Sequence, residues 1–451
     1  MSSYAQHIDQ IYFLGIGGIG MSALAFYYLE LGKDVLGYDK TKTDLCVSLE
    51  KKGAKIEYDY NLKLAKTLNK HSSLVIYTPA IKEDQPVFEY FLKHNFECVK
   101  RAKVLGEISR KKISLAVAGT HGKTTITCML GHILKENNEP VTVLAGGISE
   151  NYNSNYFANG DDVFVLEADE FDRSFLNLRP DFAVISNVDA DHLDIYSSKE
   201  NFEQGFKDFA ALIKNKSNFY HNHSLDFHGK TIGFENDADV YADAVRIENG
   251  SYIFNYHYGD ESIDNLNLKM PGEHNLFNAL CALSLAIAYK PEKALDFAKS
   301  LSSFKGVKRR FNYIAETPSH TIIDDYAHHP TEIKAVLLAI KEMHPDKRIM
   351  CVFQPHLYSR TRDFMDEFAE VLSRFDAIRL LDIYPARETP IENITSAALL
   401  NAIGLTDKKL ISKEAIVQEI YEFKNGIAVL LGAGDIGVEA QNVKKQFDNE
   451  K

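Results

Sequence analysis

The fold of this chain is decided by one stretch, Ala116-Val117-Ala118-Gly119-Thr120-His121-Gly122-Lys123-Thr124-Thr125. An apolar strand over residues 113–117 leads into a glycine-rich turn, and a helix is expected over 125–135. In such a turn, backbone N–H groups at the helix N-terminus face a phosphate, the lysine adds positive charge and the next hydroxyl can bind Mg²⁺. The usual first glycine is replaced by Val117. The stretch predicts a loop that binds a nucleoside triphosphate; the alternative is a strand-to-helix turn without a ligand.

A second glycine-rich turn lies near the N-terminus. A strand over residues 10–14 is followed by Gly15-Ile16-Gly17-Gly18-Ile19-Gly20, a helix over 21–31 and a strand that ends at Asp39. This order is typical of dinucleotide-binding units. Two interpretations stay open: a nicotinamide or flavin site, or a loop that holds a substrate diphosphate while the first loop holds ATP.

Bulk properties limit the class of protein. A chain of 451 residues is expected to form about two to four domains. Its net charge of −12 argues against a general binder of nucleic acids or membrane surfaces. No apolar run approaches the roughly 18–20 residues of a membrane helix, and the N-terminus lacks a secretory pattern. Five scattered cysteines are typical of reduced thiols, so we expect a cytoplasmic protein. We also expect a monomer or a dimer.

The distribution of strands and helices predicts an α/β protein of three domains, with boundaries at 1–107, 108–312 and 313–451. Alternating residues between 220 and 268 indicate antiparallel strands at one side of the middle domain, followed by a helix over 274–288. Strands of the third domain are expected at 321–323, 348–353, 377–381 and 427–431.

Acidic residues follow two strands of the middle domain. Glu167-Ala168-Asp169-Glu170-Phe171-Asp172 comes after the strand at 162–166, and four carboxylates this close repel one another unless a cation is bound. Mg²⁺ prefers such oxygen ligands. Asp191-His192-Leu193-Asp194 follows the next strand, at 182–186. The alternatives are a solvated acidic turn and a structural histidine.

Basic residues follow strands of the third domain. Asp324-Asp325-Tyr326-Ala327-His328-His329-Pro330 suits hydrogen bonds to a ribose or phosphate, or is simply a helix N-terminal turn. Arg360 and Arg362 suit a carboxylate or phosphate, or form a surface pair. Lys308-Arg309-Arg310-Phe311, at the domain boundary, closes onto phosphates or is a solvated hinge.

Together these motifs resemble the Mur ligases, ATP-dependent enzymes that form amide bonds in bacterial cell-wall synthesis. The resemblance spans nearly the whole chain and also includes Pro271-Gly272-Glu273-His274-Asn275-Leu276-Phe277-Asn278, Thr331-Glu332 and Gln354-Pro355-His356. It implies a Rossmann-like N-terminal domain, a central P-loop ATPase domain with a mixed sheet and a Rossmann-like C-terminal domain. The family tolerates a residue other than glycine at the position of Val117.

The resemblance also implies a reaction. The best-matching branch uses ATP and Mg²⁺ to join L-alanine to UDP-N-acetylmuramate. The lactoyl carboxylate of the sugar attacks the γ-phosphate, and the amine of alanine then attacks the acyl phosphate. The family's roles place four residues at the chemistry: Lys123, His192, His328 and Arg310.

The resemblance assigns the remaining site residues in three groups. The UDP substrate is bound by Gly15, Gly17, Gly18, Gly20, Asp39, Thr78 and Arg101. The nucleotide is bound by Gly119, Thr120, His121, Gly122, Lys123, Thr124 and Thr125, by His274, Asn275 and Asn278 near the adenine, and by Arg310 and Asp325. Magnesium is bound by Thr124, Glu167 and His192. Arg360 binds the alanine carboxylate, and because many relatives carry arginine where this chain has Leu357, it does so alone or with another group.

Three rival functions remain. A ligase that recycles a tripeptide onto UDP-N-acetylmuramate shares most motifs, but the stretches at 174–178 and 331–333 favour the alanine branch. A nicotinamide-dependent oxidoreductase leaves Lys123 and the acidic turns unexplained. A non-catalytic nucleotide switch does not need the histidines and arginines of the third domain.

Overall fold

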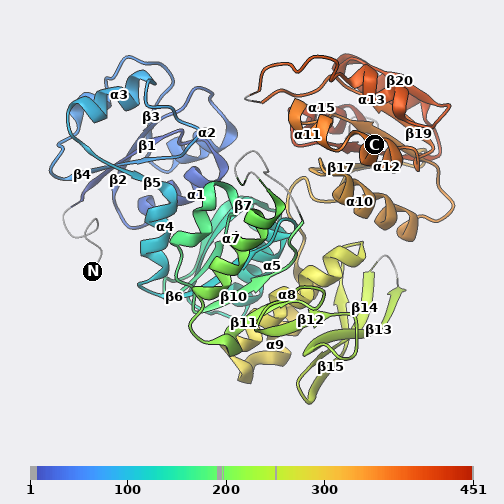
Figure 1. Ribbon diagram of the computed structural model, residues 1–451, viewed down its shortest axis with the longest axis horizontal. Helices are drawn as coiled ribbons and strands as arrows, with labels where there is room; N and C mark the ends of the chain where they lie inside the picture. The colour runs from blue at the N-terminus through green and yellow to red at the C-terminus, as the bar shows by residue number, and fades with distance from the viewer. Residues whose placement is uncertain (1–7, 190–195, 197, 249–250, 387, 449–451) are drawn as a thin grey trace. The chain divides into compact units, whose positions relative to one another are not determined.

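The computed structural model describes residues 8–189, 196, 198–248, 251–386 and 388–448, and its strands form three sheets (Figure 1). By contacts the chain divides into two compact units. The first comprises residues up to 246 together with 253–268 and 277–305, and the second comprises 247–252, 269–276 and 306 onward. The α/β class and the three-sheet organisation expected from the sequence are confirmed. The exact domain boundaries stay a prediction.

The N-terminal sheet is Rossmann-like. Its five strands are parallel in the order β3-β2-β1-β4-β5, where β1 is Gln10–Leu14, β2 Asp34–Tyr38, β3 Lys55–Glu57, β4 Ser73–Tyr77 and β5 Glu97–Lys100. Its helices are α1 (Ile19–Glu30), α2 (Asp44–Lys51), α3 (Pro86–Lys93) and α4 (Arg101–Ser109). Alternation along β1 buries Ile11 and Phe13 in one apolar cluster and Tyr12 and Leu14 in another, so both faces are covered.

Helix α1 packs on the neighbouring central sheet. The Asn155 side chain of that sheet donates hydrogen bonds to the Ile19 carbonyl at 2.6 Å and to the Ser22 hydroxyl at 2.8 Å. Tyr27 meets Phe164 edge-on with ring centroids 5.6 Å apart. One apolar cluster therefore continues through both sheets, which is why they belong to one compact unit.

The central sheet has ten strands in the order β15-β14-β13-β12-β11-β10-β6-β9-β7-β8. These strands are β6 (Ile113–Ala118), β7 (Val141–Ser149), β8 (Ser154–Ala158), β9 (Val163–Glu167), β10 (Phe182–Ile185), β11 (Phe219–Asn222), β12 (Lys230–Gly233), β13 (Val240–Glu248), β14 (Ser251–Tyr258) and β15 (Glu261–Leu268). The helices are α5 (Lys123–Glu136), α7 (Lys199–Ala211), α8 (Glu273–Tyr289) and α9 (Ala294–Ser300). The sheet is mixed, as expected, because β8 runs antiparallel to β7 whereas β6, β9 and β10 are parallel.

The expectation of antiparallel strands between residues 220 and 268 is wrong in part. Strands β10, β11, β12 and the start of β13 pair in parallel. β14 and β15 are neighbours joined by two residues, a connection that requires antiparallel strands. Alternation of polar and apolar residues reports burial on one face and carries no information about strand direction.

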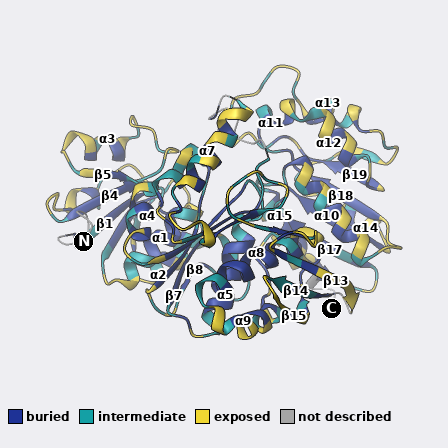
Figure 2. Ribbon diagram, turned by 60° about the horizontal axis from the view of Figure 1, so that its bottom comes forward, coloured by how far each residue is buried: buried dark blue, intermediate teal, exposed yellow. Residues whose placement is uncertain are grey.

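The C-terminal sheet has the order β16-β17-β21-β18-β19-β20, parallel except for β16. Its strands are β16 (Asn312–Glu316), β17 (His320–Asp325), β18 (Ile349–Phe353), β19 (Ala377–Leu380), β20 (Lys408–Leu410) and β21 (Gly426–Leu431). Its helices are α10 (Pro330–Met343), α11 (Tyr358–Asp363), α12 (Met365–Leu372), α13 (Ser396–Ala402), α14 (Ile416–Glu422) and α15 (Ile436–Asp448). Two apolar clusters cover its faces, and Figure 2 shows its strands buried beneath helices with exposed outer sides.

No helix within the described part of the chain is long and apolar enough to cross a lipid bilayer.

Candidate functional site

The predicted phosphate loop joins β6 to α5, and its shape requires glycine. Gly119 and Gly122 have φ angles of +140° and +84°, in the region that side chains disfavour. A Cβ on Gly119 would lie 2.1 Å from the Ser186 hydroxyl. The end of β10 pins the loop, because the Thr120 hydroxyl donates to the Asp189 carbonyl at 2.9 Å and the His121 N–H to the Asn187 side chain at 2.8 Å.

Lys123 lies at the start of α5 and binds Glu170. Its ammonium donates to both Glu170 carboxylate oxygens, at 2.7 and 2.9 Å, and to the Gly119 and Thr120 carbonyls at 2.6 and 3.1 Å. Glu170 is only 2% exposed, and burial raises its pKa to about 7, against the opposing effect of Lys123. The Glu170 carboxylate thus neutralises the positive charge of Lys123, which the sequence predicts to bind a phosphate.

Oxygen ligands stand beside the phosphate loop. The Thr124 side chain lies close enough to the Glu167 carboxylate, at the end of β9, to influence its pKa. That carboxylate accepts the Gly146 N–H at 2.5 Å. Burial raises the pKa of Glu167. Among the described residues, no group of three His, Cys, Asp or Glu side chains could hold a metal ion. One hydroxyl and one carboxylate nevertheless fit Mg²⁺, which in such sites takes its other ligands from phosphates and water.

Four further predicted nucleotide residues lie on the helices α5 and α8. Thr125 is buried in the first turn of α5. On α8, the Asn278 oxygen lies 2.5 Å from where a Gly122 Cβ would stand, so this amide reaches the phosphate loop. Asn275 donates to the Pro271 carbonyl at 2.6 Å, and His274 is exposed at the helix start.

The N-terminal glycine loop is shaped by Asp39. Its carboxylate oxygens accept the Gly17 N–H at 2.8 Å and the Thr41 N–H at 3.0 Å. Gly15 has a φ of +81°, and the Gly18 N–H donates to its carbonyl. Asp39 therefore holds the loop through backbone contacts, and α1 begins at once after it.

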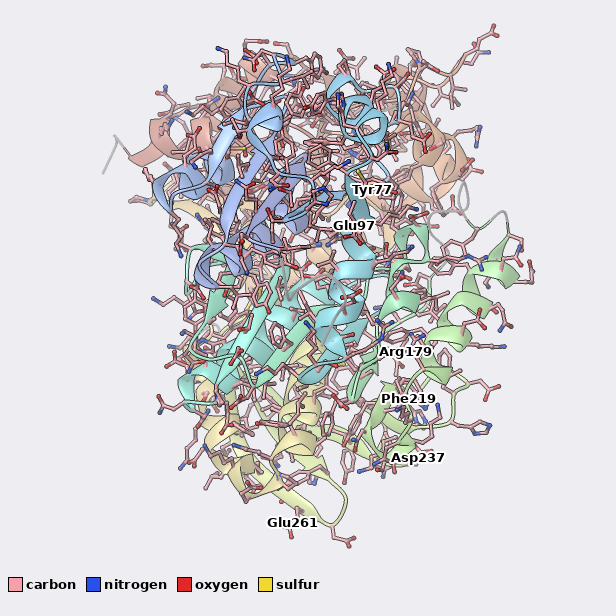
Figure 3. All side chains as sticks on the ribbon, turned by 90° about the vertical axis from the view of Figure 1, so that its left-hand side faces the viewer. Tyr77, Glu97, Arg179, Phe219, Asp237 and Glu261 are labelled. Atoms are coloured by element: carbon pink, nitrogen blue, oxygen red, sulfur yellow. The ribbon has the colours of Figure 1, made fainter. Side chains whose placement is uncertain are left out.

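Arg101 connects this loop with the acidic turn of the central sheet. Its guanidinium lies 2.4 Å from where a Cβ on Gly20 would stand, and 3.6 Å from the Asp169 carboxylate. Thr78 follows β4. A cavity of about 380 Å³ is lined by Tyr77, Glu97 and residues 98–100 and 103, and Figure 3 labels Tyr77 and Glu97. The predicted substrate residues Thr78, Arg101 and Gly20 thus lie at the carboxyl edge of one parallel sheet, the usual ligand edge.

In the second compact unit, Asp325, His328 and Arg310 lie around the start of α10. The buried Asp325 carboxylate accepts the Phe311 N–H at 2.6 Å and the Ala327 N–H at 2.7 Å. The His328 ring lies 3.1 Å from the Glu332 carboxylate, and Arg310 approaches the same carboxylate at 3.7 Å.

The two candidate arginines of α11 differ in their surroundings. Arg360 is 6% exposed, and its guanidinium lies 3.3 Å from the His356 ring. Arg362 is exposed and pairs with Asp363. Leu357, just before the helix, has a φ of +72°. A buried guanidinium beside a histidine is the better carboxylate ligand of the pair.

His192 lies outside the described residues. Sequence reasoning missed the roles of two carboxylates, Glu170 and Glu332. For Glu332 a signal exists, because a glutamate three residues after a helix N-cap is a capping pattern. For Glu170 the sequence offers only proximity to other acidic residues.

Three family models match successive parts of the chain. The Mur ligase family catalytic domain matches residues 10–113, the Mur ligase middle domain 117–286, and the Mur ligase glutamate ligase domain 309–434.

Curated relatives match over almost their whole length. A UDP-N-acetylmuramate–L-alanine ligase of Christiangramia forsetii is 49% identical, covering 98% of this chain and 99% of the relative. One of Flavobacterium psychrophilum is 47% identical, with 98% and 99% covered.

Solved structures show the same fold. The UDP-N-acetylmuramate–alanine ligase of Thermotoga maritima superposes with a TM-score of 0.83 at 26% identity, covering 98% of this chain and all of that one. A murein peptide ligase of Psychrobacter arcticus has a TM-score of 0.73 at 24% identity, with 98% and 99% covered, and shows the fold alone.

Proposed function

Because the chain belongs to the Mur ligase family, we propose that it joins L-alanine to the lactoyl carboxylate of UDP-N-acetylmuramate, with cleavage of ATP to ADP and phosphate. The observation that carries the proposal is 49% identity to an alanine ligase over 98% of the chain. The phosphate loop and the acidic residues beside it supply the groups that a phosphoryl transfer needs.

In the first step, the substrate carboxylate attacks the γ-phosphorus and an acyl phosphate forms as ADP leaves. Lys123 exchanges Glu170 for the β- and γ-phosphates and neutralises their charge, while the loop N–H groups orient them. Thr124 and Glu167 would hold Mg²⁺, and His192 would contribute a ligand for a second ion. When bound, Mg²⁺ neutralises phosphate charge and aligns the transferred group.

The N-terminal domain binds the UDP part of the substrate. Gly15, Gly17, Gly18 and Gly20 let the backbone approach the diphosphate, and the first turn of α1 presents N–H groups to it. Arg101 adds a guanidinium, a good partner for phosphate oxygens. Asp39 acts through the loop that it holds, and Thr78 borders the same edge.

In the second step, the amine attacks the acyl carbon and phosphate leaves. Arg360 pairs with the alanine carboxylate, and burial makes that pairing strong because little water competes. His328 accepts the proton that the amine loses. Arg310 binds phosphate oxygens, while Asp325 fixes the turn that carries these groups.

Measurement of phosphate release tests the proposal. Wild-type protein with ATP and Mg²⁺ should release phosphate only when both UDP-N-acetylmuramate and L-alanine are present. Lys123→Ala should abolish release, because the variant loses the ammonium that neutralises the phosphate charge at the loop. Release with the tripeptide L-alanyl-D-glutamyl-diaminopimelate and none with alanine would instead identify the recycling ligase, and NAD⁺-dependent oxidation without ATP would identify the oxidoreductase.

A further inference from the structure

Glu332 makes more contacts than a helix cap requires. It is the third residue of α10, and its Oε2 accepts the His328 N–H at 2.9 Å and the His329 N–H at 3.3 Å. The bond from the His329 N–H is one half of a capping box, and the other half is a backbone N–H bond that the His329 side chain accepts. The same carboxylate also reaches the His328 ring at 3.1 Å and Arg310 at 3.7 Å. One side chain, 12% exposed, thus joins two groups that the proposed reaction uses.

The surroundings of His328 Nδ1 fix its tautomer. Nδ1 lies 3.1 Å from Glu332 Oε2 and 3.1 Å from the Tyr326 carbonyl oxygen. An ionised carboxylate and a backbone carbonyl can only accept hydrogen bonds, so Nδ1 must carry the hydrogen. A neutral ring then has its lone pair on Nε2. The rings of Tyr326 and His356 meet the imidazole edge-on, with centroids 5.4 and 5.8 Å away.

We propose that Glu332 is a positioning residue that holds His328 with its hydrogen on Nδ1 and its basic Nε2 available to the incoming amine. This inference rests on the proposed function. As the amine nitrogen forms its bond to the acyl carbon, its proton passes to Nε2 and the carbon–oxygen bond to phosphate breaks. The imidazolium that results donates from Nδ1 to Glu332, whose negative charge stabilises it. The second oxygen of Glu332 faces Arg310 and orients that guanidinium.

Glu332→Gln tests the proposal in kinetics, because glutamine retains an acceptor for the backbone N–H groups and removes the charge. We expect kcat to fall about 10-fold or more, with little change in the KM for ATP. In the pH profile of kcat/KM for alanine, the midpoint of the acidic limb should move down by about one pH unit, because the His328 imidazolium loses its partner, the Glu332 carboxylate. Thr395→Ala, which removes the side-chain cap of α13, is the matched control: it should lower thermal stability and leave the limb in place.

A second measurement needs no activity. Nitrogen-15 NMR of histidine-labelled wild-type protein, with His328 assigned from a His328→Gln spectrum, should show hydrogen on Nδ1 at high pH. Hydrogen on Nε2 in the wild type would overturn the proposal, and so would an unmoved acidic limb in Glu332→Gln. Absence of alanine-dependent turnover in the wild type would overturn the proposed function instead, leaving the tautomer result to decide the role of Glu332.

Discussion

Glu170 competes with the nucleotide for Lys123, and Glu170→Gln measures that competition. The Lys123 ammonium makes two short hydrogen bonds to the Glu170 carboxylate, and both side chains are largely buried. Hydrogen bonds to an ionised partner contribute about 1.5–3 kcal/mol, against about 1 kcal/mol for a neutral one. In Glu170→Gln, the release of Lys123 from residue 170 should therefore cost about 1.4 kcal/mol less. The variant should bind an ATP analogue about tenfold more tightly than the wild type.

The difference in nucleotide affinity between the wild type and Glu170→Gln should depend on pH. Burial raises the pKa of Glu170 to about 7. At pH 8 the carboxylate is mostly ionised and holds Lys123, so the difference in affinity between wild type and Glu170→Gln should be largest. At pH 6 the carboxyl is mostly protonated, so the difference in affinity should nearly disappear.

Isothermal titration calorimetry with a non-hydrolysable ATP analogue and Mg²⁺, at both pH values, provides the assay. Asp172→Asn is the matched control, because Asp172 pairs at 2.9 Å with the partly exposed Lys100 and should not alter nucleotide affinity. Tenfold weaker binding by Glu170→Gln at pH 8 would refute the reasoning, since it would mean that Glu170 supports the nucleotide-bound state.

Two further predictions concern the arginines of α11 and the shape of the phosphate loop. Arg360→Ala should raise the KM for alanine at least about tenfold and leave that for ATP nearly unchanged, whereas Arg362→Ala should change neither; equal effects on both substrates would contradict the assigned role. Gly119→Ala should destabilise the protein by about 2 kcal/mol or more in thermal unfolding and weaken ATP binding, because its φ of +140° and the nearby Ser186 hydroxyl leave no room for a Cβ. Gly32→Ala, with a positive φ but nothing within 4 Å, should cost only about 1 kcal/mol; equal losses in the two variants would show that the clash is unimportant.

The sequence predicted the features that depend on local patterns. Both glycine loops lie between a strand and a helix as expected, because hydrophobic periodicity and glycine positions report short-range geometry. The parallel sheets follow from alternating strands and helices. The family resemblance then placed single residues in roles that no pattern could assign.

Features that depend on long-range packing were not predictable from sequence. The predicted direction of β11 and β12 was wrong, because alternation of polar and apolar residues does not encode strand direction. The partnership of Lys123 with Glu170 spans 47 residues of chain, and only folding brings the two together. The packing of α1 on the central sheet through Asn155 has no local signature either, since a single buried asparagine is indistinguishable from a surface one in the sequence.

Isotope transfer tests the central claim most directly. UDP-N-acetylmuramate with both lactoyl carboxylate oxygens replaced by ¹⁸O is incubated with unlabelled ATP, Mg²⁺, L-alanine and the wild-type protein. If the chain activates that carboxylate as an acyl phosphate, mass spectrometry will find one ¹⁸O in each released phosphate and the other in the new alanyl amide. Unlabelled phosphate, or a product without alanine, would contradict the account.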